Sequence, residues 1–107
     1  MTPEQKCKCR QIYSYYGRDS QLRQLAEECA ELIQAVTKLS RAYERGDDVD
    51  CFKAEVSLRE EVADVTIMLS QLREGCMLFE NKTGMSALIS RKLDRQLERI
   101  RKEMEER

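Results

Sequence analysis

Residues 20–45 read SQLRQLAEECAELIQAVTKLSRAYER, and this stretch decides the fold class. Its apolar residues return every three or four positions, which is the spacing of one face of an α-helix. The row consists of Leu22, Leu25, Cys29, Leu32, Val36, Leu39 and Tyr43. Asp19-Ser20 offers a helix start, and Gly46-Asp47-Asp48 breaks the pattern. The stretch therefore predicts a long amphipathic helix that ends near Arg45.

Helical signals also occupy most of the remaining chain. Thr2-Pro3-Glu4-Gln5 combines a capping threonine with a proline suited to the first turn, and predicts a helix that ends near Tyr16-Gly17. A third helix is expected from about Asp50 to about Phe79. Turn-forming residues at 81–84 then precede a last helix, which Ser86 caps and which reaches almost to Arg107.

The last two predicted helices also carry apolar rows. In the third helix the main row is Leu58, Val62, Val65, Leu69, Leu72 and Cys76, and a second set on another face is Val56, Ala63 and Ile67. In the last helix the row is Ile89, Leu93, Leu97, Ile100 and Met104. No alternating β-pattern persists, so we expect a single all-α domain over residues 1–107, a bundle of about four helices. A small chain with a doubly apolar helix also suggests a homo-oligomer, either a dimer or a tetramer.

Composition excludes several classes of protein. The chain has 19 basic and 20 acidic residues, so no basic field is available to hold a nucleic acid polymer. Apolar runs are too short for a membrane span, and the N-terminus lacks the apolar core of a secretory signal. We therefore expect a cytoplasmic protein.

Cysteine and histidine usage argues against a zinc site. The chain has five cysteines, no histidine and no C-x-x-C pair. We expect reduced thiols, with Cys29 and Cys76 acting as small apolar core residues. Cys7 and Cys9, near the N-terminus, give only a weak signal for a soft metal.

The carboxylates of the 20–45 stretch divide between two directions. Each residue turns a helix by about 100°, so Glu27 points about 180° from the centre of the apolar row, into water. Glu28 lies about 80° from that centre and Glu31 about 140°, on one flank. Glu61 and Asp64 repeat the same spacing beside the main row of the third helix, about 50° and 110° from its centre.

Four acids on the facing flanks of two adjacent helices indicate a site for a hard cation. Like charges in a partly dry crevice need protons or a cation to neutralise them. Oxygen ligands without imidazole suit Mg²⁺ or Mn²⁺, and magnesium commonly binds phosphate oxygens at the same time. The alternative is that these acids only solvate the helix surface, as they often do in highly charged chains.

The two acidic motifs resemble the E-E-x-x-E … E-x-x-D signature of the MazG-like all-α nucleoside triphosphate pyrophosphohydrolases. EECAE at 27–31 and EVAD at 61–64 carry this resemblance, and the surrounding residues 16–100 are similar to short, single-domain, phage-type members. The resemblance implies Mg²⁺-dependent cleavage of a (deoxy)nucleoside triphosphate to the monophosphate and pyrophosphate. It also implies that Glu28, Glu31, Glu61 and Asp64 are metal ligands, with Glu27 as a secondary catalytic candidate.

Basic and amide side chains complete the predicted site. Lys38 lies two turns beyond Glu31 on the same flank, and Lys92 and Arg95 begin the last helix, so we expect these three to contact phosphate. Gln21 and Gln24 precede Glu28 on its flank and are candidates for contacts to a nucleobase. Tyr13, Tyr15 and Tyr16 are weaker candidates for a stacking ring.

Two other classes of protein are alternatives to this hydrolase. A non-catalytic helical interaction or oligomerisation module would use the apolar rows to bind a partner and the acids only for solvation. A di-iron carboxylate bundle would normally take histidine from Glu-x-x-His motifs, and this sequence has no histidine.

Overall fold

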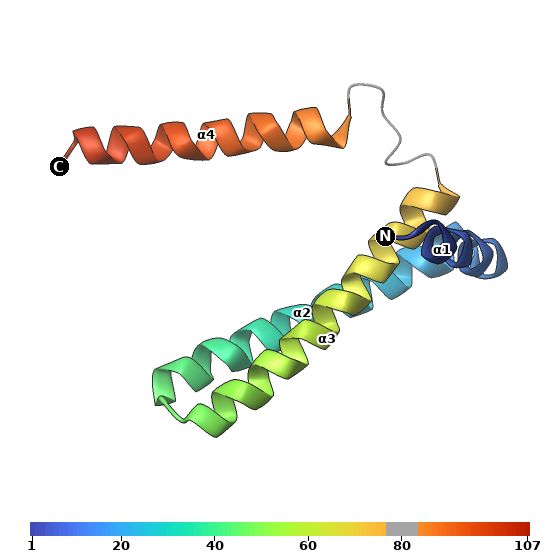
Figure 1. Ribbon diagram of the computed structural model, residues 1–107, viewed down its shortest axis with the longest axis horizontal. Coiled ribbons are helices and arrows are strands. Elements are labelled where there is room, and N and C mark those ends of the chain that lie inside the picture. Colours follow the sequence, from blue (N-terminus) through green and yellow to red (C-terminus); the bar gives the residue numbers. More distant parts are fainter. Residues whose placement is uncertain (77–83) are drawn as a thin grey trace. The chain divides into compact units, whose positions relative to one another are not determined.

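The computed structural model describes residues 1–76 and 84–107, and all regular structure in these residues is helical. Four helices follow one another along the chain: α1 (Pro3–Tyr16), α2 (Arg18–Arg45), α3 (Asp48–Gly75) and α4 (Met85–Glu105) (Figure 1). The expected all-α class and the expected number of helices are confirmed. The chain divides into two units, Met1–Cys76 and Met77–Arg107, and each is described by itself. The single domain expected over residues 1–107 stays a prediction.

The start of α1 is capped as the sequence predicts. The Thr2 hydroxyl accepts a hydrogen bond from the Gln5 backbone N–H at 3.1 Å, and the Gln5 side chain accepts one from the Thr2 N–H at 2.8 Å. This reciprocal capping box satisfies two N–H groups that the first helical turn leaves free. The helix ends at Gly17, where the sequence also placed its end.

The ends of α2 and α3 depart slightly from the expected positions. Gly17 precedes α2 directly, so the predicted cap at Asp19-Ser20 is wrong. Gly46 ends α2 in the left-handed conformation that favours glycine. Asp47 then caps α3 by accepting hydrogen bonds from two backbone N–H groups, so α3 begins before the predicted Asp50. It ends at Gly75, and the predicted end near Phe79 lies outside the described residues.

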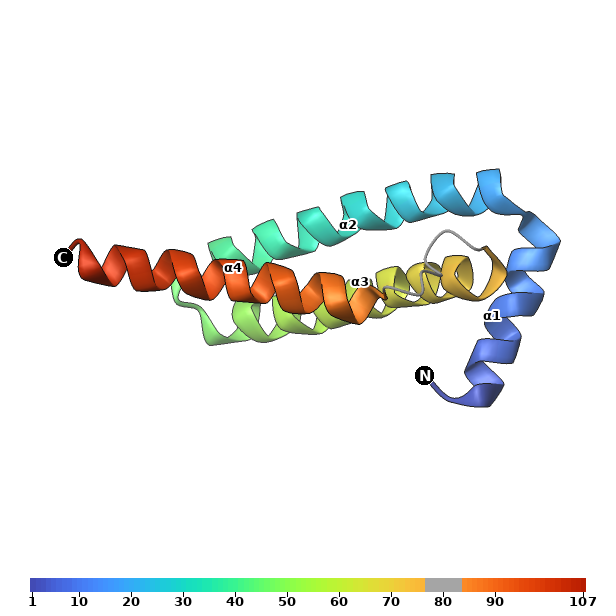
Figure 2. The ribbon, with the colours of Figure 1, turned by 90° about the horizontal axis from the view of Figure 1, so that it is seen from above.

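Helices α2 and α3 form an antiparallel hairpin, and α1 crosses the end of that hairpin opposite the Gly46–Asp47 link (Figure 2). Buried and half-buried positions alternate at three and four residues along both helices, as in a coiled coil. On α2 they are Gln21, Leu25, Glu28, Leu32, Ala35, Leu39 and Ala42. On α3 they are Cys51, Ala54, Leu58, Glu61, Val65, Met68 and Leu72. We call these two rows together the hairpin interface.

The hairpin interface corrects the apolar rows expected from the sequence. Leucines such as Leu25 and Leu58 do face the partner helix, but Leu22, Val36, Tyr43, Val62 and Leu69 are exposed. Each predicted row combines residues that face the partner helix with neighbouring apolar residues that are exposed. The centre of the predicted row therefore lies between these two sets. The helices pack along the row that contains alanines and acids, so Glu28 and Glu61 face the partner helix more directly than predicted.

Close contact near Gly75 holds α1 against α3. A β-carbon at Gly75 would collide with the Tyr13 ring, so the two helices approach more closely there than a larger residue allows. Arg10 and Glu74 add an ion pair at 3.1 Å between the same helices. Cys9 is buried on α1, and its thiol lies 3.7 Å from the Met1 sulfur. The predicted core cysteines Cys29 and Cys76 are half-buried.

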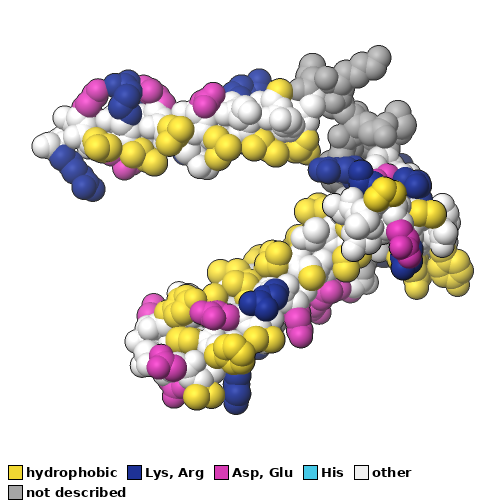
Figure 3. Space-filling model, in the orientation of Figure 1, with side chains coloured by type: hydrophobic (Ala, Val, Ile, Leu, Met, Phe, Trp, Pro, Cys, Tyr) yellow, Lys and Arg dark blue, Asp and Glu magenta, His cyan; other side chains and the backbone are white. Residues whose placement is uncertain are grey.

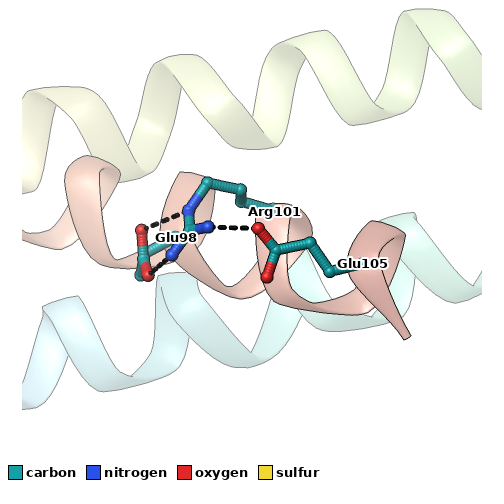
Figure 4. A network of polar contacts seen from close by, with 3 residues as sticks. All are labelled: Glu98, Arg101 and Glu105. Atoms are coloured by element: carbon teal, nitrogen blue, oxygen red, sulfur yellow. Dashed lines mark hydrogen bonds and ion pairs between the residues drawn. The ribbon is translucent and has the colours of Figure 1, made fainter.

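The C-terminal unit contains α4, which presents the predicted apolar row on one side and charged residues on the other (Figure 3). Ile89, Leu93, Leu97, Ile100 and Met104 are all exposed. Gly84, rather than the predicted Ser86, stands at the N-terminal cap. On the charged side, Arg101 donates hydrogen bonds to Glu98 and Glu105, and the bond from Arg101 lowers the pKa of Glu98 (Figure 4). Exposed pairs of this kind contribute little to stability.

None of the four described helices combines the length and the apolar character that crossing a bilayer requires.

Candidate metal centre and adjoining cleft

Three of the four predicted metal ligands converge at the hairpin interface. Glu28 and Glu31 come from α2 and Glu61 from α3, and one oxygen of each lies within 4.8 Å of the other two. Glu28 and Glu61 are half-buried and Glu31 is exposed. We call these three residues the acidic cluster. The convergence of these three side chains agrees with the spacing predicted from the sequence.

The electrostatics of the acidic cluster are unfavourable without a counter-charge. Glu28 Oε2 and Glu61 Oε2 are buried and have no hydrogen-bond partner among the described residues. A buried polar atom left in this state costs about 1–3 kcal/mol, and a charged one more. The charge on Glu28, and then that on Glu61, raises the pKa of Glu31. The cluster is therefore poised to take up positive charge, either as a proton or as a cation.

The donor set fits a hard divalent cation. All three donors are carboxylate oxygens, which Mg²⁺ and Mn²⁺ prefer. Glu28, Glu31 and Glu61 would hold such an ion after their side chains draw closer together, since their oxygens lie within 4.8 Å of one another. The two unpartnered buried oxygens are the atoms that such an ion would satisfy.

Asp64 lies outside the acidic cluster. It is exposed on α3 and lines a cleft that also contains Glu28. The structure therefore brings together Glu28, Glu31 and Glu61 but sets the fourth predicted ligand beside them. This position leaves the Asp64 carboxylate available for another task.

The cleft opens where α1, α2 and α3 meet, and its volume is about 370 Å³. Helix α1 contributes Ile12 and Tyr16. Helix α2 contributes Ser20, Gln21, Gln24 and Glu28, and α3 contributes Asp64, Ile67, Met68 and Gln71. One end of the cleft is thus acidic, and the rest combines amides with apolar side chains.

The site residues are spaced identically on the two helices of the hairpin. On α2 they are Gln21, Gln24, Glu28 and Glu31, and on α3 they are Glu61, Asp64, Met68 and Gln71. Because the helices are antiparallel, Glu31 and Glu61 meet at one end of this series and Gln21 and Gln71 at the other. Gln71 and Met68 were not among the site residues predicted from the sequence. The signal was present, since Gln71 follows Asp64 by the same two helical turns that separate Gln21 from Glu28.

Two of the three amides that line the cleft are buried, whereas the third, Gln24, is exposed. Gln21 and Gln71 are each only 4% exposed, and Gln21 Oε1 has no partner within the described part of the chain. Gln24 Nε2 donates a hydrogen bond to Glu28 Oε1 at 2.9 Å, which ties this amide to the acidic cluster. Both glutamines predicted to contact a base therefore lie in the cleft.

Of the remaining predicted residues in the N-terminal unit, Glu27 and Lys38 belong neither to the acidic cluster nor to the cleft. Glu27 is exposed, as its angle indicates. Lys38 lines a different hollow of about 280 Å³ near the Gly46–Asp47 link, together with Arg45 and Lys53. Lys92 and Arg95 lie on α4 in the C-terminal unit, where both are exposed.

The three candidate tyrosines also separate. Tyr16 lines the cleft, and its ring packs edge-on against Tyr15 with centroids 4.9 Å apart. Tyr13 contacts the backbone at Gly75 instead, which is the packing role that tyrosines near a helix end commonly have.

No protein-family model, curated protein or solved structure matches this chain. The resemblance of its two acidic motifs to the MazG-like family therefore stays a prediction from the sequence.

Proposed function

We propose that this protein is a Mg²⁺-dependent nucleoside triphosphate pyrophosphohydrolase of the MazG-like type, which cleaves a (deoxy)nucleoside triphosphate to the monophosphate and pyrophosphate. The observation that carries the proposal is the acidic cluster, in which three carboxylates lie within 4.8 Å and two buried oxygens have no partner in the part of the chain that the structure describes. The adjoining cleft supports it, because amides, a tyrosine ring and apolar side chains suit a nucleoside.

Glu28, Glu31 and Glu61 would hold the ion, and Mn²⁺ is the alternative to Mg²⁺. When bound, such an ion supplies Lewis-acid chemistry that neutralises phosphate charge and makes water more acidic. Glu28 also orients Gln24 through their hydrogen bond, so one helix positions the ligand and the amide together.

Asp64 is the candidate proton acceptor. It lies beside the acidic cluster rather than within it, so its carboxylate is less engaged in ligation. A carboxylate in this position can take the proton of a water that attacks the α-phosphorus, with pyrophosphate as the leaving group. No side-chain nucleophile is required for this route.

The test is a panel of common and modified nucleoside triphosphates incubated with millimolar Mg²⁺. Monophosphate and pyrophosphate are the expected products, in equal amounts and dependent on the ion. Release of inorganic phosphate instead would indicate a different bond cleavage. Survival of every triphosphate in the panel would overturn the proposed activity.

We propose that the enzyme acts as a homo-oligomer, a dimer or a tetramer, in the cytoplasm. Large apolar side chains on the outer faces of the hairpin support association with a second copy, since Ile33 and Phe52 are each 66% exposed. The odd number of cysteines suits a reducing compartment. Light scattering coupled to gel filtration measures the oligomeric state, and a monomer at micromolar concentration would contradict association.

The same exposed apolar faces favour a second candidate, a non-catalytic interaction module. The two functions differ in their response to Mg²⁺. The hydrolase requires that millimolar Mg²⁺ raise the melting temperature and that Glu61→Gln weaken this rise. The interaction module predicts that Glu61→Gln leaves both the stability of the protein and any response of its melting temperature to Mg²⁺ unchanged.

A further inference from the structure

We propose that the hollow near the Gly46–Asp47 link binds a polyphosphate group without a metal ion, either as free pyrophosphate or as the terminal phosphates of a nucleotide. The hollow lies between α2 and α3 and has a volume of about 280 Å³. All four predicted metal ligands lie outside its lining. The inference therefore does not depend on the proposed hydrolase.

Three basic side chains line this hollow from two helices. Lys38 and Arg45 come from α2 and Lys53 from α3, and all three are exposed. Among the described residues that line the hollow, Asp50 is the one acid, and its Oδ2 lies 3.9 Å from Arg45 Nη2. Neither lysine forms an ion pair within residues 1–76 and 84–107. Three cations against one acid leave two positive charges in excess.

The floor of the hollow supplies no counter-charge. Ala35 and Ala42 are only 5% and 1% exposed, and Ala54 is half-buried. Their methyl groups leave space between the two helices and offer no partner to an ammonium or guanidinium group. Like charges around an apolar floor repel one another, so an anion that enters the hollow relieves an unfavourable arrangement.

Ser57 adds a neutral hydrogen-bond donor to the hollow. The hydroxyls of Thr66 and Ser70, on the same helix, donate to a backbone carbonyl one turn earlier. The Ser57 hydroxyl makes no hydrogen bond of this kind in the part of the chain that the structure describes. A free hydroxyl beside lysines and an arginine is a combination that phosphate oxygens accept from readily.

The charge and position of the hollow favour a polyphosphate over a smaller anion. Two excess positive charges match a group with several negative charges better than a monovalent ion. Lys38 follows Glu31 by seven residues, which is about 10 Å along the helix. An anion held by Lys38 and Lys53 is therefore bound by these side chains themselves, without sharing an ion at the acidic cluster.

The experiment is a chemical-shift titration of the full-length protein with sodium pyrophosphate in EDTA, so that no divalent cation contributes. We expect saturable shifts of the backbone amides at Lys38, Arg45 and Lys53. The double variant Lys38→Gln/Lys53→Gln should bind pyrophosphate about tenfold more weakly or worse, because two charge-assisted hydrogen bonds are lost.

Lys6→Gln/Lys8→Gln is the matched control, because it removes the same charge from exposed positions of α1. Helix α1 crosses the other end of the hairpin (Figure 2), so its exposed charges are screened from the hollow and the affinity should stay within about twofold of the wild type. Circular dichroism checks that each variant folds. Three results would overturn the inference: no saturable shifts in the wild type, shifts centred on residues outside the hollow, or equal weakening in the two double variants.

A second titration, with dATP in the same buffer, distinguishes the two sources of the ligand. If dATP binds more tightly than pyrophosphate and Lys38→Gln/Lys53→Gln removes this binding too, the hollow takes the terminal phosphates of a nucleotide. Equal or weaker binding of dATP assigns the hollow to free pyrophosphate. Cleavage of triphosphates with Mg²⁺ but no shifts in EDTA would keep the proposed hydrolase and refute this inference. Shifts at the hollow without cleavage would do the reverse.

Discussion

The hairpin interface has two halves that share one spacing and carry opposite chemistry. In the half next to α1, its buried and half-buried positions include Gln21, Glu28 and Glu61. In the half next to the Gly46–Asp47 link, the positions of the same series hold Ala35, Ala42 and Ala54. We call these the acidic half and the alanine half. The alanine half buries small apolar groups at no electrostatic cost. The acidic half buries two carboxylate oxygens that have no hydrogen-bond partner among residues 1–76 and 84–107, which costs stability.

This contrast places the candidate site in one half of the helical hairpin. Both halves would pack adequately with alanine and leucine, so the acids and amides of one half need a reason other than folding. Residues of an active site are commonly less favourable for stability than the residues that could replace them. Substitutions in the two halves should therefore have different consequences, one for activity and the other for stability.

The largest expected effect is the loss of activity in Glu61→Gln. The substitution keeps the shape of the side chain but removes the charge of one proposed ligand, so hydrolysis should fall by about 100-fold or more. Steady-state rates measure this, with folding checked by circular dichroism. Glu55→Gln is the matched control on the same helix. Glu55 accepts a hydrogen bond from the Tyr43 hydroxyl near the Gly46–Asp47 link and lies outside the acidic cluster. Similar losses in both variants would remove the distinction between the halves.

Gly75→Ala tests the close contact between α1 and α3 beside the acidic half of the hairpin interface. Replacing glycine by alanine in a helix ordinarily raises stability by about 0.5–1 kcal/mol. Here the new β-carbon would collide with Tyr13, so we expect the free energy of unfolding to fall by about 1–3 kcal/mol instead. Urea titration measures the change. A gain in stability would show that α1 does not approach α3 as closely as described.

Ala42→Leu tests the alanine half. Ala42 is 1% exposed and borders the hollow of about 280 Å³ beside Lys38, so a leucine there must displace neighbouring side chains to reach that space, and unfolding should become easier by about 1–3 kcal/mol. The activity of the folded fraction should stay near that of the wild type, because the acidic cluster lies in the other half. Ala30→Leu, on the exposed side of α2, provides the control. A loss of activity that exceeds the unfolded fraction would mean that the halves are coupled.

The smallest expected effect is the pH dependence of the metal-free protein. Since the pKa of Glu31 is raised in the folded state, folding favours its protonated form. This contribution is complete below the unfolded pKa of about 4.5 and is lost as the pH rises through the folded pKa. When the pH is lowered from 7 to 5 in EDTA, the melting temperature should therefore rise more for the wild type than for Glu31→Gln. Glu27→Gln, at an exposed neighbour, should keep the wild-type slope.

The sequence predicts the parts of this fold that depend on local chemistry. Thr2, Gly17 and Gly46 act through neighbouring backbone groups, so the corresponding helix ends appear where expected. The meeting of Glu28, Glu31 and Glu61 also follows from helical spacing and a short link.

Other features depend on contacts between distant residues. The position of α1 depends on Tyr13 meeting Gly75, and no pattern within α1 indicates that partner. The centre of each apolar row was misplaced because two rows overlap in the sequence, and only packing selects between them. Gln71 was missed for the same reason, since a buried amide looks like a surface residue until the partner helix is known.

The two-residue link between α2 and α3 has a consequence for the site that lies far from it. The link fixes the register of the hairpin, and with it which α3 residue stands opposite Glu28. An insertion of one residue within α3 before Glu61 would rotate that side chain by about 100° around the helix axis. The acids would then point to different sides, although no ligand had been changed. If the acidic cluster holds Mg²⁺ as proposed, loop length sets metal affinity. Insertions or deletions between residues 32 and 60 should then be tolerated only where they restore the alignment of the two helices.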